Sequence, residues 1–250
     1  MRIIAIANQK GGVGKTSTAV NLGAALSRAG QRVLLVDMDP QSSLTDYFVE
    51  SGHLTSTIYN ALKDGETVKP YYIGTSIALL PANIDLAAAE IELPAKHKYT
   101  HHRRLARVLR DYTADYCLVD CPPSLGELTV NALQAAHYAL IPVSTELMAE
   151  RTVKLILSTI EDIRESELNS AIQVWRILPT LYDMRLAHHQ EILEALRVKY
   201  GTLLYPDPVR ATTKYKDAVT IHADVSELDP RLGEYWNTLA FLLLKETSEV

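Results

Sequence analysis

A short glycine-rich segment near the start of the chain has the residue types and spacing that bind phosphate groups. Residues Gln9–Ser17 read Gln-Lys-Gly-Gly-Val-Gly-Lys-Thr-Ser. The glycines let the main chain approach an anion closely and adopt positive φ where a tight turn requires it. Lys15 can place its amine on the outer phosphates of a nucleotide, and the Thr16 hydroxyl is a ligand for Mg²⁺. A mere strand-to-helix connection would not need the Gly-Lys-Thr ending, so the segment predicts phosphate binding.

Carboxylates follow two further apolar runs, at points where strands are expected to end. Asp37 comes directly after Val33–Val36, with Asp39 two residues later, and Asp120 comes directly after Tyr116–Val119. At the carboxyl ends of parallel strands, such groups face the crevice in which ligands bind. There one carboxylate can support a magnesium ion, and another can orient an attacking water molecule. The Asp-Pro-Gln sequence that begins at Asp39 is equally compatible with a simple turn.

Short apolar runs alternate with longer helical patterns, and these elements must position the glycine-rich and acidic segments. Most of the runs are continuously apolar, which is typical of parallel strands covered on both faces. A helix is expected at Lys15–Ala29, with Gly30 placed for a left-handed C-terminal cap. The predicted fold class is α/β: a single P-loop domain over residues 1–250, with a mostly parallel, twisted sheet of about seven or eight strands and helices on both faces. The expected strands are Ile3–Ala7, Val33–Val36, Ile77–Leu80, Tyr116–Val119, Tyr138–Val143, Val174–Leu178 and Leu203–Tyr205.

The composition is that of an ordinary soluble globular protein. The chain has 250 residues, of which 47% are hydrophobic and 22% are charged, so it can bury a substantial core. No apolar run approaches the roughly 18 residues that a membrane span needs, and the first residues do not resemble a signal peptide. Two cysteines favour a reducing cytoplasm over a disulfide-linked fold. The net charge of −5 decides nothing about nucleic acid, because a basic face can be local.

The glycine-rich loop departs from the standard P-loop pattern at its first position. The standard pattern has glycine where this chain has Gln9, and here a second lysine, Lys10, precedes the glycines. In this respect the loop resembles that of the deviant Walker A ATPases, in which the first lysine crosses a dimer interface to the partner's nucleotide. The alternative for Lys10 is a solvated loop lysine.

Further motifs resemble the ParA/Soj branch of that family and extend the resemblance over about residues 2–244. They are Val33–Gln41, the Asp-Cys-Pro-Pro-Ser-Leu-Gly segment that begins at Asp120, and the looser segments Ile141–Val143, Leu178–Asp183 and Leu228–Arg231. The resemblance implies a slow ATPase that forms a homodimer with ATP and Mg²⁺, binds double-stranded DNA nonspecifically, and drives partition or positioning of a chromosome, plasmid or other cargo. It also implies a ParB-like or cargo-adaptor partner that stimulates hydrolysis, a cytoplasmic, nucleoid-associated location, and no attachment to membranes.

The resemblance also assigns roles to individual residues. Catalytic roles are assigned to Lys10, Lys15 and Asp39, of which Asp39 orients the attacking water. The magnesium ligands or their supports are Thr16, Asp37 and Asp120. The residues expected to bind ATP are Lys10, Gly11, Gly12, Val13, Gly14, Lys15, Thr16, Ser17, Thr180, Pro208, Val209 and Arg210. For DNA, the resemblance points to Arg185 and Lys214, and the nearby basic residues Lys216 and Arg210 are expected to help. The alternative for each of these residues is a solvated side chain.

Two other functions are open at this stage. A MinD-like membrane ATPase needs a basic amphipathic C-terminal helix, whereas Glu234–Glu246 has one lysine against two glutamates and is better interpreted as a helix docked on the body. A metabolic or metallocentre-maturation enzyme could use the same loop, although nothing else in the chain supplies its substrate chemistry. No N-terminal helix-turn-helix domain is expected, because the loop begins near residue 10.

The chain has two nearby cysteines and two pairs of adjacent histidines, which are potential metal ligands, but the sequence does not favour metal binding by them. Cys117 and Cys121 are interpreted as small core residues rather than ligands of an iron–sulfur cluster. The pairs His101-His102 and His188-His189 are interpreted as polar surface, because adjacent residues on a helix point to different faces.

Overall fold

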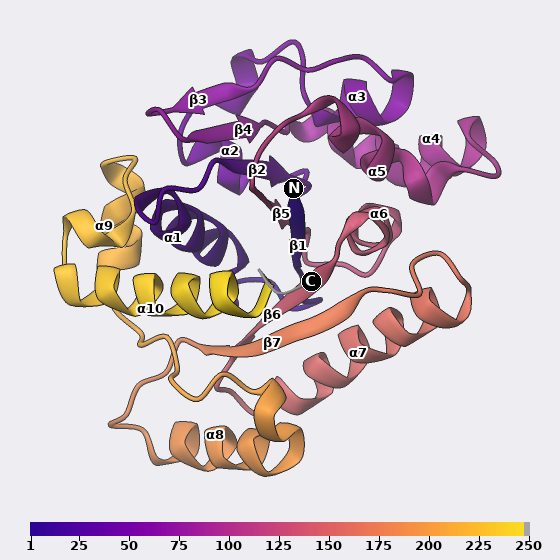
Figure 1. Cartoon of the computed structure of the whole chain (residues 1–250). Helices are drawn as coiled ribbons and strands as arrows, with labels where there is room; N and C mark the ends of the chain where they lie inside the picture. Colours follow the sequence, from indigo (N-terminus) through magenta and orange to yellow (C-terminus); the bar gives the residue numbers. More distant parts are fainter. Residues whose placement is uncertain (248–250) are drawn as a thin grey trace.

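The computed structural model describes residues 1–247, and its centre is a seven-stranded sheet (Figure 1). The strand order is β3-β4-β2-β5-β1-β6-β7, and neighbouring strands are parallel except for β3 and β4. This arrangement confirms the predicted α/β class and the mostly parallel sheet. The strands are β1 (Arg2–Ile6), β2 (Val33–Asp37), β3 (Tyr71–Ile73), β4 (Ile77–Leu80), β5 (Tyr116–Asp120), β6 (Tyr138–Ser144) and β7 (Gln173–Thr180).

Helices follow most of the strands and lie on both faces of the sheet, as predicted (Figure 1). On β1, Ile4 and Ile6 contribute to one apolar core, whereas Ile3 and Ala5 contribute to the other. Helices α1, α2 and α10 cover the first core, and helices α3 to α8 cover the second. The α-helices are α1 (Lys15–Arg28), α2 (Ser43–Asp46), α3 (Ile58–Asp64), α4 (Ala89–Lys96), α5 (Arg104–Val108), α6 (Glu127–Ala135), α7 (Ala149–Glu165), α8 (Ala187–Tyr200), α9 (Lys214–Thr220) and α10 (Pro230–Thr247).

The strand expected at Leu203–Tyr205 is wrong. Residues Gly201–Leu203 form a 3-10 turn, and Leu204 makes only an isolated parallel bridge to Ile177 of β7. Leu204 and Tyr205 are buried, and the Tyr205 N–H donates to the Ile177 carbonyl at 2.8 Å. The apolar run therefore reflects packing beside the edge strand β7 rather than a further strand.

The antiparallel edge strand β3 has no counterpart among the expected strands. Tyr71–Ile73 pairs with β4, but the Tyr72 side chain is 65% exposed. The Tyr-Tyr-Ile strand has only three residues and is largely exposed, although Ile73 packs against the core that contains α1. Its pairing is therefore visible only in the structure.

The helix α1 positions the glycine-rich loop against the sheet. Gly30 has φ +82°, so the left-handed cap expected after this helix is confirmed. A Cβ added at Gly23 would lie only 3.0 Å from Cδ2 of Leu35, which shows how closely α1 approaches β2. This close packing holds the start of α1, and with it the loop, at the end of β1.

The C-terminal helix α10 packs against α1, as the sequence predicts for Glu234–Glu246. Its residues Trp236, Leu239 and Leu243 are buried in the same core as α1. Within residues 1–247, no helix combines the length and apolar character that crossing a membrane requires.

Candidate functional site

Strand ends that carry predicted functional residues meet at one edge of the sheet. The glycine-rich loop follows β1, Asp37 ends β2 and Asp120 ends β5. The parallel register places Asp120 opposite Ile6 of β1 and opposite Asp37 of β2. The chain also changes direction at β1, because β2 and β4 lie on one side of it and β6 and β7 on the other. Such a switch point forms the crevice in which open α/β sheets bind ligands.

The glycine-rich loop has the backbone conformation that phosphate binding requires. Gly12 and Gly14 have φ of +71° and +86°, where glycine is favoured, and Gly14 caps the N-terminus of α1. Thr18 secures the first turn, because its N–H and hydroxyl donate to the Gly14 carbonyl at 2.8 and 2.7 Å. The Thr180 hydroxyl, at the end of β7, donates to the Val13 carbonyl at 2.8 Å. The loop therefore offers an anion a fixed helix N-terminus.

A cavity of about 600 Å³ lies against the loop, which is within the range of small-molecule sites. Gly11, Gly12, Gly14, Lys15, Thr16 and Ser17 of the loop line it. Asp39 and Thr180 also line it, as do Val209 and Arg210 from the segment expected to flank adenine. Among the described residues, Pro208 of that segment is not part of the lining.

Aromatic side chains that sequence reasoning missed complete the wall of this cavity. They are Tyr47 after α2, Tyr215 on α9 and Trp236 on α10. The Trp236 indole N–H donates to the Tyr215 hydroxyl at 3.1 Å, so the two rings hold each other in place. These residues are scattered along the sequence and follow no motif, so only the packing of α9 and α10 brings them to the loop.

Thr16 and Asp120 form an arrangement that fits a magnesium ion. The Thr16 hydroxyl donates to Oδ2 of Asp120 at 2.7 Å, and Oδ1 of Asp120 is buried without a hydrogen-bond partner. Burial raises the pKa of Asp120 above its usual range, and the nearby Asp37 carboxylate raises it further. A bound divalent cation reverses both effects, because it supplies the missing positive charge. Oxygen ligands of this kind, completed by water and phosphate, are those that Mg²⁺ prefers.

The Asp37 carboxylate already accepts hydrogen bonds from the protein at both oxygens, and one of these bonds holds the backbone of Asp39 in position. Its Oδ1 accepts the Asp39 N–H at 3.0 Å, and its Oδ2 accepts the N–H and hydroxyl of Thr45 at 2.8 and 2.7 Å. Complete burial raises the pKa of Asp37 to about 7. The role of Asp37 in the magnesium site stays a prediction. Thr45 is a supporting residue that no sequence signal identified, because it reaches Asp37 from α2.

The two loop lysines point to different places. The Lys15 amine is buried and donates to the Lys10 carbonyl at 3.2 Å, and burial lowers the pKa of Lys15. The Lys10 amine donates to the Ser144 hydroxyl at 3.1 Å and forms an ion pair with Glu146. Lys10 lines a separate hollow of about 280 Å³, together with Glu146, Leu147, Met148 and His188, which we call the Lys10 hollow. Lys15 thus faces its own cavity, whereas Lys10 does not line it.

The residues predicted to contact DNA lie in different environments. The Arg185 side chain is 84% exposed and pairs with Asp183 at 2.6 Å. The Lys214 amine donates to the Leu228 carbonyl at 3.2 Å. Lys216 and Arg210 both line the cavity beside the loop. Their DNA contacts stay a prediction.

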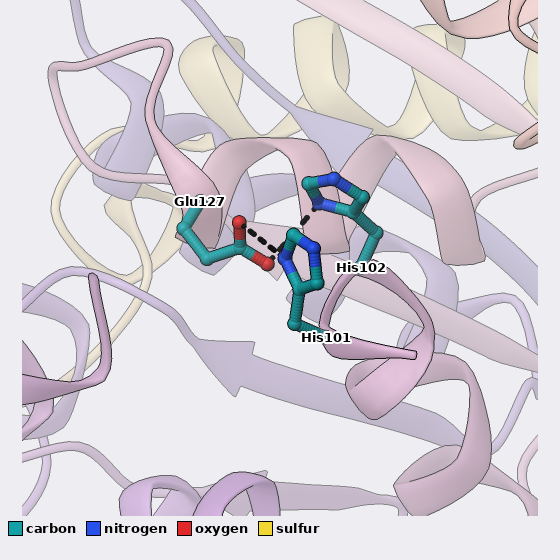
Figure 2. Close-up of side chains that lie close together, drawn as sticks. All are labelled: His101, His102 and Glu127. Carbon is teal, nitrogen blue, oxygen red and sulfur yellow. Dashed lines mark hydrogen bonds and ion pairs between the residues drawn. The ribbon is translucent and has the colours of Figure 1, made fainter. Parts of the chain in front are cut away.

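The adjacent histidines His101 and His102 differ from the sequence interpretation. Both rings face the same carboxylate, that of Glu127, instead of pointing to different faces (Figure 2). They belong to a 3-10 turn, His101–Arg103, so the face rule for an α-helix does not apply. Cys117 and Cys121 are free, buried thiols, as expected for core residues.

Three comparisons with known proteins report what the chain is similar to. Residues 1–174 match a family model described as an AAA domain. The sporulation initiation inhibitor protein Soj of Bacillus subtilis is 36% identical over 236 residues, which cover 92% of this chain and 92% of Soj. The chromosome partitioning protein ParA of Caulobacter vibrioides is 35% identical over 87% of this chain and 84% of that protein. Among solved structures, a cobyrinic acid a,c-diamide synthase from Mycobacterium smegmatis with bound ATP analogue and magnesium is 35% identical, with a TM-score of 0.81 over 99% of this chain and 97% of that one.

Proposed function

This chain belongs to the ParA/Soj family of partition ATPases, and on that premise we propose that it is a switch that dimerises with ATP. The observation that carries the proposal is that the two loop lysines lie at different sites. Lys15 serves the cavity of its own chain, while Lys10 stands outside that cavity at the surface. A lysine in that position is available to the nucleotide of a second copy.

ATP and Mg²⁺ are the proposed ligands of the cavity. The loop N–H groups and the Lys15 amine bind the phosphates, and Thr16 and Asp120 hold the magnesium ion. When bound, the ion neutralises negative charge that develops on the phosphates. Asp39 is half-buried at the cavity wall, where its carboxylate orients the attacking water. The hydrogen bond from its N–H to Asp37 fixes the backbone of Asp39, so little reorganisation is needed.

The surface beside Lys10 has the properties of a contact between two copies. The Leu147 side chain is 88% exposed and that of Met148 is 46% exposed, and both line the Lys10 hollow. Large exposed apolar side chains that are surrounded by polar residues are typical of interaction sites. In a dimer, the Lys10 amine exchanges its ion pair with Glu146 for the partner's phosphates. This exchange is favourable because a triphosphate carries more negative charge than the Glu146 carboxylate.

Light scattering with different nucleotides tests the dimer. We expect ATP with Mg²⁺, but not ADP, to convert the monomer into a dimer. Lys10→Ala should remain folded and monomeric with ATP, because the bridge to the partner's phosphates is lost. Lys154→Ala, which removes an exposed lysine of α7, is the control and should dimerise normally. Dimerisation of Lys10→Ala with ATP would overturn the role of Lys10.

DNA and a protein partner complete the proposed cycle. Arg185, Lys214, Lys216 and Arg210 are sparse on one subunit, and pairing two subunits would join their charges into one surface. Such a surface would bind double-stranded DNA through its phosphates, without sequence preference. A ParB-like or cargo-adaptor protein would stimulate the otherwise slow hydrolysis and release the dimer. We further propose that the chain is one domain over residues 1–250, and that it acts in the cytoplasm on the nucleoid.

A second candidate function follows from the similarity to the cobyrinic acid a,c-diamide synthase. An enzyme that works through a covalent intermediate commonly uses an activated cysteine thiolate. Burial raises the pKa of both Cys117 and Cys121 well above the usual range, so neither is a ready nucleophile. Turnover of ATP with cobyrinic acid and free ammonia, without stimulation by DNA and a ParB-like protein, would favour this second function.

The packing of α10 bears on the membrane alternative. Its apolar residues Trp236, Leu239 and Leu243 are engaged with the core that contains α1. Insertion into a lipid surface would first have to remove them from that core. ATP-dependent attachment to anionic liposomes, measured by sedimentation, would nevertheless favour a MinD-like function over the DNA-bound one.

A further inference from the structure

We propose that His101, His102 and Glu127 form a site for one divalent transition-metal ion of the zinc class, separate from the nucleotide cavity. The three residues come from the 3-10 turn His101–Arg103 and from the first residue of α6 (Figure 2). None of them lines the cavity at the glycine-rich loop. Their ligand atoms are two imidazole nitrogens and a carboxylate.

The ligand atoms have the spacing that a tetrahedral ion requires. Nδ1 of His101 lies 3.0 Å from Oε2 of Glu127, and Nδ1 of His102 lies 3.2 Å from Oε1. All the ligand atoms lie within 4.8 Å of one another. Zinc–ligand bonds of about 2.0–2.1 Å in a tetrahedron separate neighbouring ligands by roughly 3.3 Å. A small adjustment of the side chains is therefore enough to admit the ion.

The cluster is incompletely satisfied by the protein. Nδ1 of His102 is buried and has no hydrogen-bond partner, although it faces Oε1 of Glu127. The Glu127 side chain is only 8% exposed, and its ion pairs among residues 1–247 are with the two histidines. Buried carboxylates are normally paired with a firm positive charge or coordinate a metal. A metal ion would give Nδ1 of His102 a partner and would neutralise the Glu127 carboxylate, which already has hydrogen bonds with His101 and Asn131.

Neighbouring residues hold the ligands in place. The Asn131 amide donates to Oε1 of Glu127 at 2.8 Å, and its own oxygen accepts the N–H groups of Arg104 and Leu105 at 3.0 and 3.2 Å. One side chain thus ties α6 to the start of α5, directly after the histidines. The Glu90 carboxylate, which accepts the Glu127 N–H at 2.6 Å, adds negative charge nearby. Hydrogen bonds from surrounding residues to the metal ligands orient those ligands and raise the affinity for the metal.

The ligand set and its exposure indicate which ions fit. Two imidazoles and one carboxylate suit zinc and chemically similar ions better than Mg²⁺ or Ca²⁺. The side chains of His101 and His102 are 20% and 31% exposed, so the ion can enter from solvent. The metal binds Nδ1 of the neutral rings, so the ring hydrogen lies on Nε2 in the metal-bound form.

Titration with Co²⁺ tests the site on the full chain, without nucleotide or Mg²⁺. We expect one equivalent of Co²⁺ to bind with a visible absorption band, and Zn²⁺ to displace it. His102→Ala and Glu127→Gln should weaken binding at least tenfold, because each removes a ligand. His188→Ala is the matched control, since it removes an exposed member of the other histidine pair, and it should bind normally. Asp120→Asn should also retain the band, which separates this site from the magnesium site.

A second measurement keeps the test independent of how the variants fold. In the unmodified protein, Zn²⁺ should shift the NMR signals of two histidine rings and raise Tm through preferential binding to the native state. The proposal is overturned by the absence of stoichiometric Co²⁺ binding, or by equal affinity in His102→Ala, Glu127→Gln and His188→Ala. It is also overturned if the band disappears in Asp120→Asn but not in Glu127→Gln.

Discussion

The edge of the sheet around β1, β2 and β5 differs in kind from the segment that follows β7. At the edge, Asp37 and Asp120 are buried and Thr16 is half-buried; the Thr16 hydroxyl donates to Asp120, and Asp37 accepts from Thr45. After β7, Arg185 is exposed and paired with Asp183, and Lys214 is bound to a backbone carbonyl. The first region is organised before any ligand arrives, whereas the second region presents separate charges.

The difference reflects how each region binds its proposed ligand. A compact phosphate group needs donors at fixed distances, and burial makes each interaction strong while excluding water. A DNA backbone is long and charged, so exposed residues can bind it through counterion release without a fixed geometry. On the proposed function, the phosphate loop and the magnesium ligands are organised within one chain, whereas DNA binding would depend on pairing two chains.

The largest effect is expected at Asp39, in the organised region. Asp39→Ala should lower the rate of ATP hydrolysis about 10²–10³-fold, as is typical when one preorganised catalytic group is lost. ATP binding and dimer formation should persist, because the phosphate loop is unchanged. The measurement is phosphate release under saturating ATP. Asp46→Ala, which removes another carboxylate of the cavity wall, is the control. An equal loss of hydrolysis rate in Asp46→Ala would contradict the role of Asp39 in orienting the water.

A smaller effect, on ATP binding, is expected from two lysines that line the same cavity, one from each region. Lys15→Ala should weaken ATP binding about 10–100-fold, because it removes a charge-assisted hydrogen bond of about 1.5–3 kcal/mol. Lys216→Ala, at the same cavity but on α9, should weaken it much less. Isothermal titration with a non-hydrolysable ATP analogue measures both. A larger loss in Lys216→Ala would assign Lys216 to the nucleotide rather than to DNA.

A further test concerns the exposed charges. Arg185→Glu and Lys214→Glu should each reduce ATP-dependent retention on duplex DNA, and each should lower the salt slope by about 1 per lost phosphate contact. Dimerisation with ATP should be unchanged in both. Arg151→Glu reverses an exposed charge on α7 and serves as the control. Binding that ignores salt, or that prefers one sequence, would count against a phosphate-based contact.

The smallest effect is expected at the hydrogen bond that joins the two regions. Thr180→Val should lower the free energy of unfolding by about 1 kcal/mol, because it removes the donor to the Val13 carbonyl. Urea denaturation measures this change. Thr238→Val removes a comparable hydroxyl on the exposed face of α10 and should have a smaller effect. If the two variants are equally stable, the Thr180 contact does not support the loop.

Much of this architecture was predictable from local sequence. Gly12, Gly14 and Lys15 define the phosphate loop by type and spacing, and the continuous apolar runs identify buried parallel strands such as β2 and β5. Once those strands are parallel neighbours, Asp37 and Asp120 must come together at their ends. The α/β class, the helix α1 with its cap at Gly30, and the docked helix α10 all follow from such patterns.

Only the tertiary structure decided the features that depend on long-range packing. It placed Leu204 beside Ile177 without a strand, brought Thr45 to Asp37, and turned both His101 and His102 toward Glu127. Periodicity reports whether a side chain is buried, because burial follows the repeat of a helix or strand. It does not report which distant residue lies opposite. Partners across the fold are set by how the elements pack against one another, and that information is distributed over the whole chain.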